Sequence, residues 1–356
     1  MKIKIIKADE PSNVRLRKYF IYFLKEKIDF EFVGWKRQKD GASEVRFPII
    51  FLLRGGGYGS KTLFLLYPLW MIKLFFYIVF HRNLGAYKLI AVNFDCAFPI
   101  YLASLIRRVN YIYEIHDDFA LSYNFPTWLK SILIKIDKRI KAKAKNIIHV
   151  DINRKLDSDE NVIIIENSPY DFYKGQSFKK VEPVSLSYAI IGNISKARGA
   201  LQILDFATEN PEISFLVAGK FYDYELKDAF LSRKNIIYYD YMPQEELFVL
   251  LSNCSGIFSI YDPSLEINRL AASNKVYDAM MLGIPVITNK EVINSSFIRN
   301  HDIGFVINYE VDFTWDILKS KDFLSIASNK GANGRKLFCE KYDFERLIES
   351  NLLPIL

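Results

Sequence analysis

Cysteine is scarce in this sequence, with three residues among 356. Cys96, Cys254 and Cys339 stand far apart and form no C-x-x-C pair, which argues against a zinc site or a disulfide framework. Internal repeats and low-complexity runs are also missing. The first residues, MKIKIIKADEPSN, have neither the apolar core nor the cleavage site of a secretory signal peptide. We therefore expect a folded protein of the reducing cytoplasm.

The length and composition predict two folded domains. A chain of 356 residues exceeds the usual size of a single core, and its 50% hydrophobic and 15% aromatic content argues against disorder. Charge is unevenly divided: residues 1–150 hold 26 Lys and Arg against 12 Asp and Glu, while residues 151–356 hold 22 against 29. A basic first part implies an anionic partner. Nucleic acid, anionic lipid and a diphosphate substrate all qualify.

Strand and helix patterns alternate along the chain. Residues 2–7, 14–27 and 29–34 read as strand, helix and strand, which is the opening of a parallel sheet. Buried strands recur in both halves, and a segment rich in Asn, Pro, Gly and Ser separates the two halves. We predict an α/β protein with four parts, namely a first domain at 1–168, a linker at 169–184, a second domain at 185–340 and a C-terminal helical segment at 341–356.

The stretch from Ser273 to Asn289, SNKVYDAMMLGIPVITN, predicts a capped helix, a glycine stop and a buried strand. Asn274, Lys275 and Asp278 share the polar face of the helix. Free amides and an ammonium group at a helix start suit a phosphate, and a carboxylate one turn further along suits ribose hydroxyls. The alternative is a core helix on which Lys275 and Asp278 form a surface ion pair.

The run SNKVYDAMMLGIPVIT resembles the C-terminal signature of family 4 glycosyltransferases of the GT-B fold. The resemblance implies two Rossmann-like domains facing each other across a cleft, with a C-terminal helix that crosses back onto the first domain. It further implies that the second domain binds a nucleotide diphosphate sugar and the first binds the acceptor. The sugar would be transferred with retention of its anomeric configuration. No cofactor beyond the donor is expected.

The resemblance also assigns donor-binding residues. GNISKARG is similar to the family pattern G-R-x-x-x-x-K-G, with Asn193 at the arginine position and Arg198 at the lysine position. Leu270 stands where many relatives carry the first acid of an E-x₇-E pair, and Glu266 is the nearest substitute. The implied donor-binding set is Gly192, Asn193, Arg198, Gly199, Tyr241, Met242, Ser264, Asn274, Lys275 and Asp278.

In the first domain, a predicted strand ends in His116, Asp117 and Asp118, and YEIHDDF is similar to the Y-x-x-H-D segment of the family. There the histidine lies beside the donor sugar. From the residues alone, capping aspartates or a metal pair are alternatives. Neighbouring carboxylates at a strand end chelate poorly and the family needs no divalent metal, so we expect no metal. The implied catalytic residues are His116, Arg198 and Lys275, and the implied acceptor-side residues are Ser12, Asn13, Arg15 and Asp95.

Two segments of the first domain invite other interpretations. RGGGYGSKT, residues 54–62, nearly matches an ATP-binding loop, but Ser60 replaces its last glycine and no acidic magnesium partner follows, so we favour a loop that covers the acceptor. Residues 62–80 are strongly hydrophobic but are interrupted by Pro68 and Lys73. A membrane span here would split the predicted sheet, and two interpretations remain: a core helix, or a helix that docks on a membrane surface.

The family resemblance implies a glycosyltransferase of surface polysaccharide biosynthesis, such as capsule or O-antigen assembly. The basic first domain, the hydrophobic segment 62–80 and the basic run from Lys135 to Lys145 together predict that it attaches to the inner face of the cell membrane and uses a lipid-linked acceptor. Asn193 and Leu270 motivate an alternative, a degenerate GT-B protein that binds a nucleotide or glycan without turnover. A nucleic-acid binder would use the basic half, but no nucleic-acid-binding module is recognisable in the sequence, so we expect no nucleic-acid partner.

Overall fold

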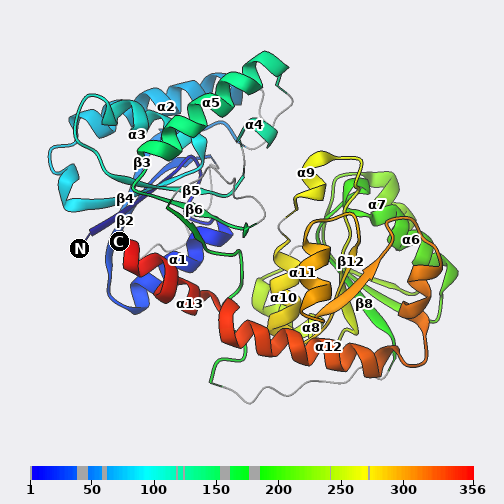
Figure 1. Ribbon diagram of the computed structural model, residues 1–356. Coiled ribbons are helices and arrows are strands. Elements are labelled where there is room, and N and C mark those ends of the chain that lie inside the picture. Colours follow the sequence, from blue (N-terminus) through cyan, green and yellow to red (C-terminus); the bar gives the residue numbers. More distant parts are fainter. Residues whose placement is uncertain are drawn as a thin grey trace. The chain divides into compact units, whose positions relative to one another are not determined.

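The computed structural model describes residues 2–37, 47–57, 62–117, 119–122, 125–152, 161–175, 185–240, 242–271 and 273–356. The chain forms two compact units (Figure 1). Unit 1 comprises Met1–Glu166 and Leu347–Leu356, and unit 2 comprises Asn167–Arg346. The first segment of unit 1 therefore ends two residues before the predicted end of the first domain at 168, and the chain returns to unit 1 near its C-terminus.

Unit 1 is a seven-stranded parallel sheet in the order β3-β2-β1-β4-β5-β6-β7. Its strands are β1 Lys2–Lys7, β2 Asp29–Lys36, β3 Ile49–Arg54, β4 Tyr87–Val92, β5 Tyr111–Ile115, β6 Asn146–His149 and β7 Val162–Ile164. Its helices are α1 Val14–Lys25, α2 Leu63–Phe80, α3 Phe94–Ser104, α4 Phe119–Ser122 and α5 Thr127–Lys143, with a 3₁₀ turn at Leu84–Ala86.

Helices cover both faces of this sheet, which explains why its strands are nearly continuous apolar runs. Alternate residues of β2 point to opposite faces: Phe30 stacks on Phe20 of α1, while Trp35 stacks on Trp70 of α2. Figure 1 shows α2, α3 and α5 on one side of the sheet and α1 on the other. The final residues join the α1 side, where the Asn351 side chain donates to the carbonyl of Ile164 on β7.

Unit 2 is a six-stranded parallel sheet in the order β10-β9-β8-β11-β12-β13. Its strands are β8 Ser187–Ile194, β9 Ser214–Phe221, β10 Ile236–Tyr239, β11 Gly256–Ser259, β12 Val286–Asn289 and β13 Gly304–Ile307. Its α-helices are α6 Ala200–Glu209, α7 Tyr224–Leu231, α8 Gln244–Leu251, α9 Glu266–Arg269, α10 Asn274–Leu282, α11 Asn294–Asn300, α12 Phe323–Leu337 and α13 Phe344–Leu347, which ends on the first residue of the returning segment. Shorter helical segments of unit 2 lie at Lys196–Arg198 (η3), Phe313–Lys319 and Phe338–Tyr342, and those of the returning part of unit 1 lie at Ile348–Leu352 and Leu353–Ile355.

The sheet of unit 2 also separates two apolar cores. On β8, Tyr188 and Ile190 point into one core, and Ala189 and Ile191 point into the other. In both units the strand order reverses once: successive strands are first added on one side of the starting strand and then on the other. This reversal lies between β1 and β4 in unit 1 and between β8 and β11 in unit 2. In open parallel sheets, ligands bind at the carboxyl ends of the strands beside such a reversal. The fold therefore indicates one candidate ligand-binding edge in each unit, at the carboxyl ends of the strands beside the reversal.

The predicted segment 62–80 is the half-buried helix α2. Trp70, Leu74 and Ile78 are fully buried, while Leu65, Leu69, Ile72, Phe76 and Phe80 are 38–73% exposed. Within the described ranges, no helix has both the length and the apolarity that crossing a membrane requires. Ser60 and Lys61, which the ATP-loop interpretation used, lie outside the described residues.

Candidate functional site

The candidate edge of unit 2 is built on glycines with positive φ. Gly192, at the end of β8, has φ 86°, and Gly199, which starts α6, has φ 68°. A side chain on Gly199 would collide with Ile260, which follows β11. Gly199 lets the turn around η3 lie directly against the end of β11, at the reversal of the sheet. The turn is further held by the amide of Asp262, which donates to the carbonyl of Ala197 at 3.1 Å.

Two cations converge at this edge. The Arg198 guanidinium from η3 lies 4.5 Å from the ring centre of Tyr261, and the Lys275 ammonium from α10 lies 5.6 Å from the same ring centre. Both side chains are partly exposed. Neither forms an ion pair with a carboxylate in the described part of the chain. Two unneutralised cations beside a partly open edge attract an anion with more than one charge.

The start of α10 adds hydrogen-bond donors to this edge. Ser273 occupies the N-cap position, but its side chain does not cap the helix and is instead bonded to the hydroxyl of Ser259 at 2.8 Å. The first amides of α10 therefore keep their capacity to bind an anion. Asp278 is buried and Lys275 has no carboxylate partner among the described residues, so the two do not form the surface pair of the alternative interpretation.

The other implied donor residues lie at the same end of unit 2 in different settings. Asn193 is exposed at the end of β8, and Asn274 is exposed on the first turn of α10. Ser264 is exposed, and its amide donates to Asp262 at 2.9 Å. Met242 is partly buried before α8, whereas Tyr241 lies outside the described residues. Glu266, the proposed substitute for the missing acid, is exposed at the start of α9.

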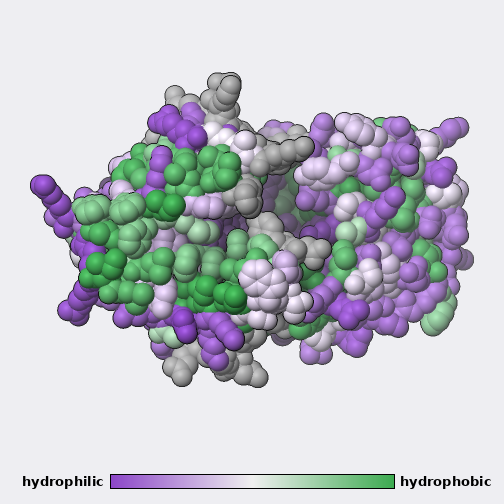
Figure 2. All heavy atoms as spheres, turned by 90° about the horizontal axis from the view of Figure 1, so that it is seen from above, coloured by the Kyte–Doolittle hydropathy of each residue, from purple (hydrophilic) through white to green (hydrophobic). Residues whose placement is uncertain are grey.

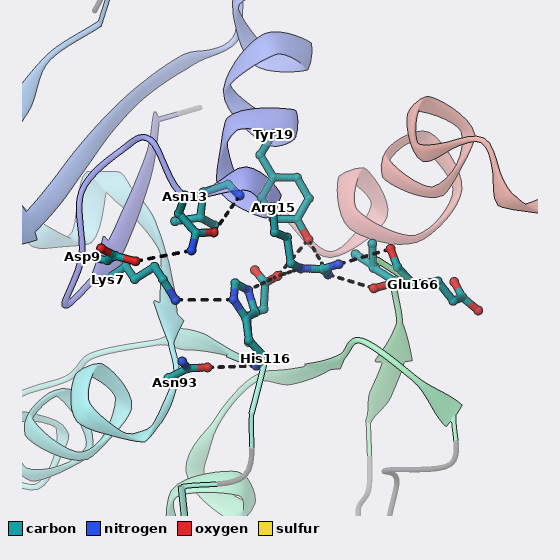
Figure 3. Close-up of polar contacts among 11 residues, drawn as sticks. Lys7, Asp9, Asn13, Arg15, Tyr19, Asn93, His116 and Glu166 are labelled. Carbon is teal, nitrogen blue, oxygen red and sulfur yellow. Dashed lines mark hydrogen bonds and ion pairs between the residues drawn. The ribbon is translucent and has the colours of Figure 1, made fainter. Parts of the chain in front are cut away.

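In unit 1, polar residues from four elements meet at the carboxyl edge of the sheet (Figure 3). His116 follows β5 and has both ring nitrogens in contact with partners: Nδ1 lies 3.4 Å from Lys7 Nζ, and Nε2 lies 3.0 Å from Glu114 Oε1. Its backbone amide donates to the side chain of Asn93 at 2.9 Å. Asn93 has a φ of 66°, which residues other than glycine rarely adopt and which is common at functional sites.

The surroundings of His116 set its protonation state. Burial and the neighbouring Lys7 ammonium lower the pKa of His116 to about 4, although Glu114 opposes this shift. Burial alone would raise the pKa of Glu114, but Arg15 and the bond from His116 outweigh it and lower this pKa to about 2. Since Glu114 only accepts and Lys7 only donates, neutral His116 carries its hydrogen on Nε2. The imidazole is thus neutral and fixed in orientation at neutral pH.

Arg15 is buried and is bound within unit 1. Its Nε donates to Glu114 at 2.6 Å, and its terminal nitrogens donate to Tyr19 and to the carbonyls of Ile165 and Glu166. Figure 3 shows this guanidinium between α1 and the last residues before unit 2. The structure therefore places Arg15 in a position to hold the site together, with its donors largely used.

The remaining acceptor-side residues lie near the same edge. Asn13 caps α1, accepting from the amide of Leu16 and donating to Asp9. Ser12 is exposed beside it. Asp95 lies in the first turn of α3, directly after the reversal of the sheet, and burial raises its pKa to about 6.

Of the residues in the metal-pair interpretation, Asp118 lies outside the described residues. Among the described ones, no three His, Cys, Asp or Glu side chains come close enough together to hold a metal ion. The absence of a metal requirement stays a prediction.

Sequence reasoning missed two residues that organise these edges. The ring of Tyr261 lies beside both Arg198 and Lys275. In the sequence, only the polar cluster that follows a buried strand could have indicated this tyrosine. Glu114 is fully buried and accepts hydrogen bonds from Arg15, Tyr19 and His116. Its signal was visible: a single charged residue inside the otherwise apolar strand YIYEI must have a partner.

No family model matches the chain, and a search of curated proteins finds no relative by sequence. Solved structures do match. Sucrose-phosphate synthase from Thermosynechococcus elongatus has a TM-score of 0.74 at 13% identity, over 98% of this chain and 96% of that one. Anabaena HepE in complex with UDP has a TM-score of 0.68 at 13% identity, over 98% and 97%. WaaG, a glycosyltransferase involved in lipopolysaccharide biosynthesis, has a TM-score of 0.63 at 11% identity, over 98% of both chains.

These similarities cover nearly the whole chain and, together with the two parallel sheets, confirm the predicted GT-B fold. The predicted membership of family 4 is not tested by them. At this level of identity the similarity establishes architecture, and function has to be argued from the site.

Proposed function

We propose that this protein is a retaining glycosyltransferase of family 4 that transfers a sugar from a nucleotide diphosphate sugar to a lipid-linked glycan acceptor in surface polysaccharide biosynthesis. The observation that carries this proposal is the pair of cations, Arg198 and Lys275, which converge without carboxylate partners in the described chain. They lie at the reversal of the unit 2 sheet, the expected ligand position in such a fold. Solved structures of the same fold include one bound to UDP-glucose, which makes a nucleotide sugar a reasonable ligand class.

The donor would be bound mainly through its diphosphate. Arg198 can contact two phosphate oxygens at once, while Lys275 and the first amides of α10 supply further donors. Asp278, one turn along α10, is the proposed acceptor of ribose hydroxyls. As the sugar leaves, charge grows on the diphosphate, and fixed cations stabilise that charge more strongly than the ground state.

Unit 1 is the proposed acceptor-binding part. Ser12, Asn13 and Asp95 offer groups that can hydrogen-bond to hydroxyls, and His116, fixed by Lys7 and Glu114, is proposed to orient the sugar. We favour attack of the acceptor hydroxyl on the same face from which the diphosphate departs, with the proton passing to the departing phosphate. This route needs no carboxylate nucleophile and agrees with the absence of a carboxylate fixed by sequence spacing.

A thermal-shift panel tests the donor class. The purified protein is heated with UDP-, GDP- and CDP-sugars, because a ligand at about a hundred times its dissociation constant stabilises the folded state by about 2.7 kcal/mol. We expect one nucleotide series to raise the melting temperature clearly. A melting temperature that none of the UDP-, GDP- or CDP-sugars raises would contradict the proposal.

Asn193 and Leu270 favour a second candidate, a degenerate GT-B protein that binds nucleotide or glycan without turnover. Incubation with the stabilising nucleotide sugar distinguishes the two. Release of nucleoside diphosphate, by hydrolysis or by transfer, supports the enzyme. Binding without any release supports the degenerate protein.

We predict that a chelator leaves activity intact, because protein cations are available to the leaving diphosphate. The measurement is nucleoside diphosphate release with and without EDTA. Loss of activity that magnesium or manganese restores would revive the metal interpretation of His116, Asp117 and Asp118.

The proposed acceptor and location depend on an exposed apolar surface of unit 1. The exposed face of α2 is formed by Leu65, Leu69, Ile72, Phe76 and Phe80. On α5, Trp128 and Ile132 are also exposed, and Lys135, Lys138 and Arg139 follow them on the same helix. Figure 2 shows that the viewed side of unit 1 is largely hydrophobic. Large apolar surfaces beside basic residues are typical of proteins that dock on anionic membranes.

We predict salt-sensitive binding to anionic liposomes that depends on α2. Replacing Ile72, Phe76 and Phe80 with serine should move the protein from the liposome pellet to the supernatant, because these side chains are at least half exposed. Phe75 is left unchanged because it packs against the core. The matched control replaces Leu201, Ile237 and Val249, which are similarly exposed in unit 2. Equal recovery in the supernatant for all variants, lipids and salt concentrations would refute membrane attachment.

A further inference from the structure

Tyr261, which follows β11, is firmly held at the unit 2 edge. Its backbone is held at both ends by one side chain: Asn289 Oδ1 accepts from the Tyr261 amide at 3.0 Å, and Asn289 Nδ2 donates to the Tyr261 carbonyl at 3.1 Å. Asn289 is itself fully buried at the end of β12. The tyrosine side chain is 5% exposed. The backbone of Tyr261 is therefore fixed between the ends of β11 and β12, and its side chain is enclosed by the protein.

The aromatic ring of Tyr261 contacts both cations of the proposed diphosphate site. Arg198 and Lys275 both lie within the distance at which a cation is attracted to an aromatic face, at 4.5 Å and 5.6 Å from its centre. Like charges repel each other, and no carboxylate in the described chain pairs with either one. The aromatic ring is thus the group that holds them together without neutralising them.

We propose that Tyr261 is a positioning residue, which keeps Arg198 and Lys275 directed at one diphosphate before the ligand binds. The inference rests on the proposed function and extends it to a residue that contacts the cations. A carboxylate in the same place would also gather the cations, but it would compete with the phosphate for them. A neutral ring avoids this competition, and prearranged cations lose less entropy when the ligand binds.

The test measures the binding of inorganic pyrophosphate by calorimetry, because this probe contains the diphosphate and no nucleobase. Tyr261→Leu removes the ring and should weaken pyrophosphate binding by about tenfold, whereas Tyr261→Phe keeps the ring and should stay close to the wild type. Inorganic phosphate, which does not need two aligned cations, should be affected much less. Each variant is first checked for an unchanged melting transition.

A second measurement does not depend on the folding of the leucine variant. The charged groups that act on the phenol are Lys275 from α10 and Arg198 from η3, and the hydroxyls of Ser273 and Ser259 also contact it. Although burial opposes them, together they lower the pKa of Tyr261 below its usual value. Raising the pH toward the usual pKa of a tyrosine, about 10, should therefore form a phenolate that competes with pyrophosphate. The wild type should lose affinity as the pH rises, and Tyr261→Phe should lose less.

The outcomes separate the two proposals. If the wild type binds no pyrophosphate, both the diphosphate site and the role of Tyr261 are overturned. If it binds pyrophosphate and both Tyr261 variants match its affinity and pH profile, the role of Tyr261 is overturned while the proposed function stands. A selective loss in Tyr261→Leu, with rescue in Tyr261→Phe, supports the inference.

Discussion

Replacing Arg198 with alanine is expected to weaken the binding of a nucleoside diphosphate by about tenfold to a hundredfold and to leave the protein folded. Lys275→Ala should have an effect of the same order. A hydrogen bond between a cation and a phosphate is worth about 1.5 to 3 kcal/mol. Neither cation pairs with a described carboxylate, so removing one leaves no buried charge without its partner.

The neighbouring Lys196 provides a matched control. It lies on the same turn, η3, but its ammonium is exposed and lies 3.5 Å from the carboxylate of Asp223. Lys196→Ala removes the same charge within two residues of Arg198, and we expect little change in affinity. Calorimetric titration of all three variants with UDP and GDP makes the comparison. Equal losses in Lys196→Ala and Arg198→Ala would indicate a general effect of charge and would place the diphosphate elsewhere.

The local sequence predicted the elements of this site well. The strand predicted before His116 is β5, Tyr111–Ile115, and the predicted stretch 273–289 contains the helix α10 and the strand β12, with Gly283 ending the helix at φ 66°. Caps, glycine stops and apolar runs act over a few residues, so they can be read directly from the chain. The same holds for the glycine turn at Gly192 and Gly199.

Contacts between distant residues could not be read in this way. Tyr261 is positioned by Asn289, 28 residues away, and Glu114 is paired with Arg15, 99 residues away. Composition did not show which face of α2 is buried, because that helix is apolar on all sides. The helix α12 contains Gly331 and Gly334, which disfavour a helix locally, but Gly331 packs directly on the backbone of Gly283, so tertiary packing decides.

Substitution of Glu114 by leucine is expected to destabilise the protein by about 3 to 5 kcal/mol, the usual cost of removing one partner of a buried ion pair. Glu114 is fully buried, and Arg15 is 3% exposed. The leucine variant would leave the Arg15 guanidinium buried without a countercharge, and it would also remove the acceptor of Tyr19 and His116. Arg15 also donates to the carbonyls of Ile165 and Glu166, the last residues before unit 2. We therefore expect the destabilisation to extend to this segment.

The double variant Arg15→Met, Glu114→Leu separates the charge effect from simple loss of packing. Replacing both partners with apolar residues removes the unpaired charge, so at least part of the stability should return. The control is Asp29→Ala, which breaks the ion pair with Lys2 in the same unit, where both side chains are more than half exposed, and should have little effect. Urea unfolding followed by tryptophan fluorescence reports on unit 1 through the buried Trp35 and Trp70 and on unit 2 through the buried Trp315. If the double variant is as unstable as Glu114→Leu, the cost arises from packing or from the lost bonds of Tyr19 and His116, and the buried ion pair does not hold this site together.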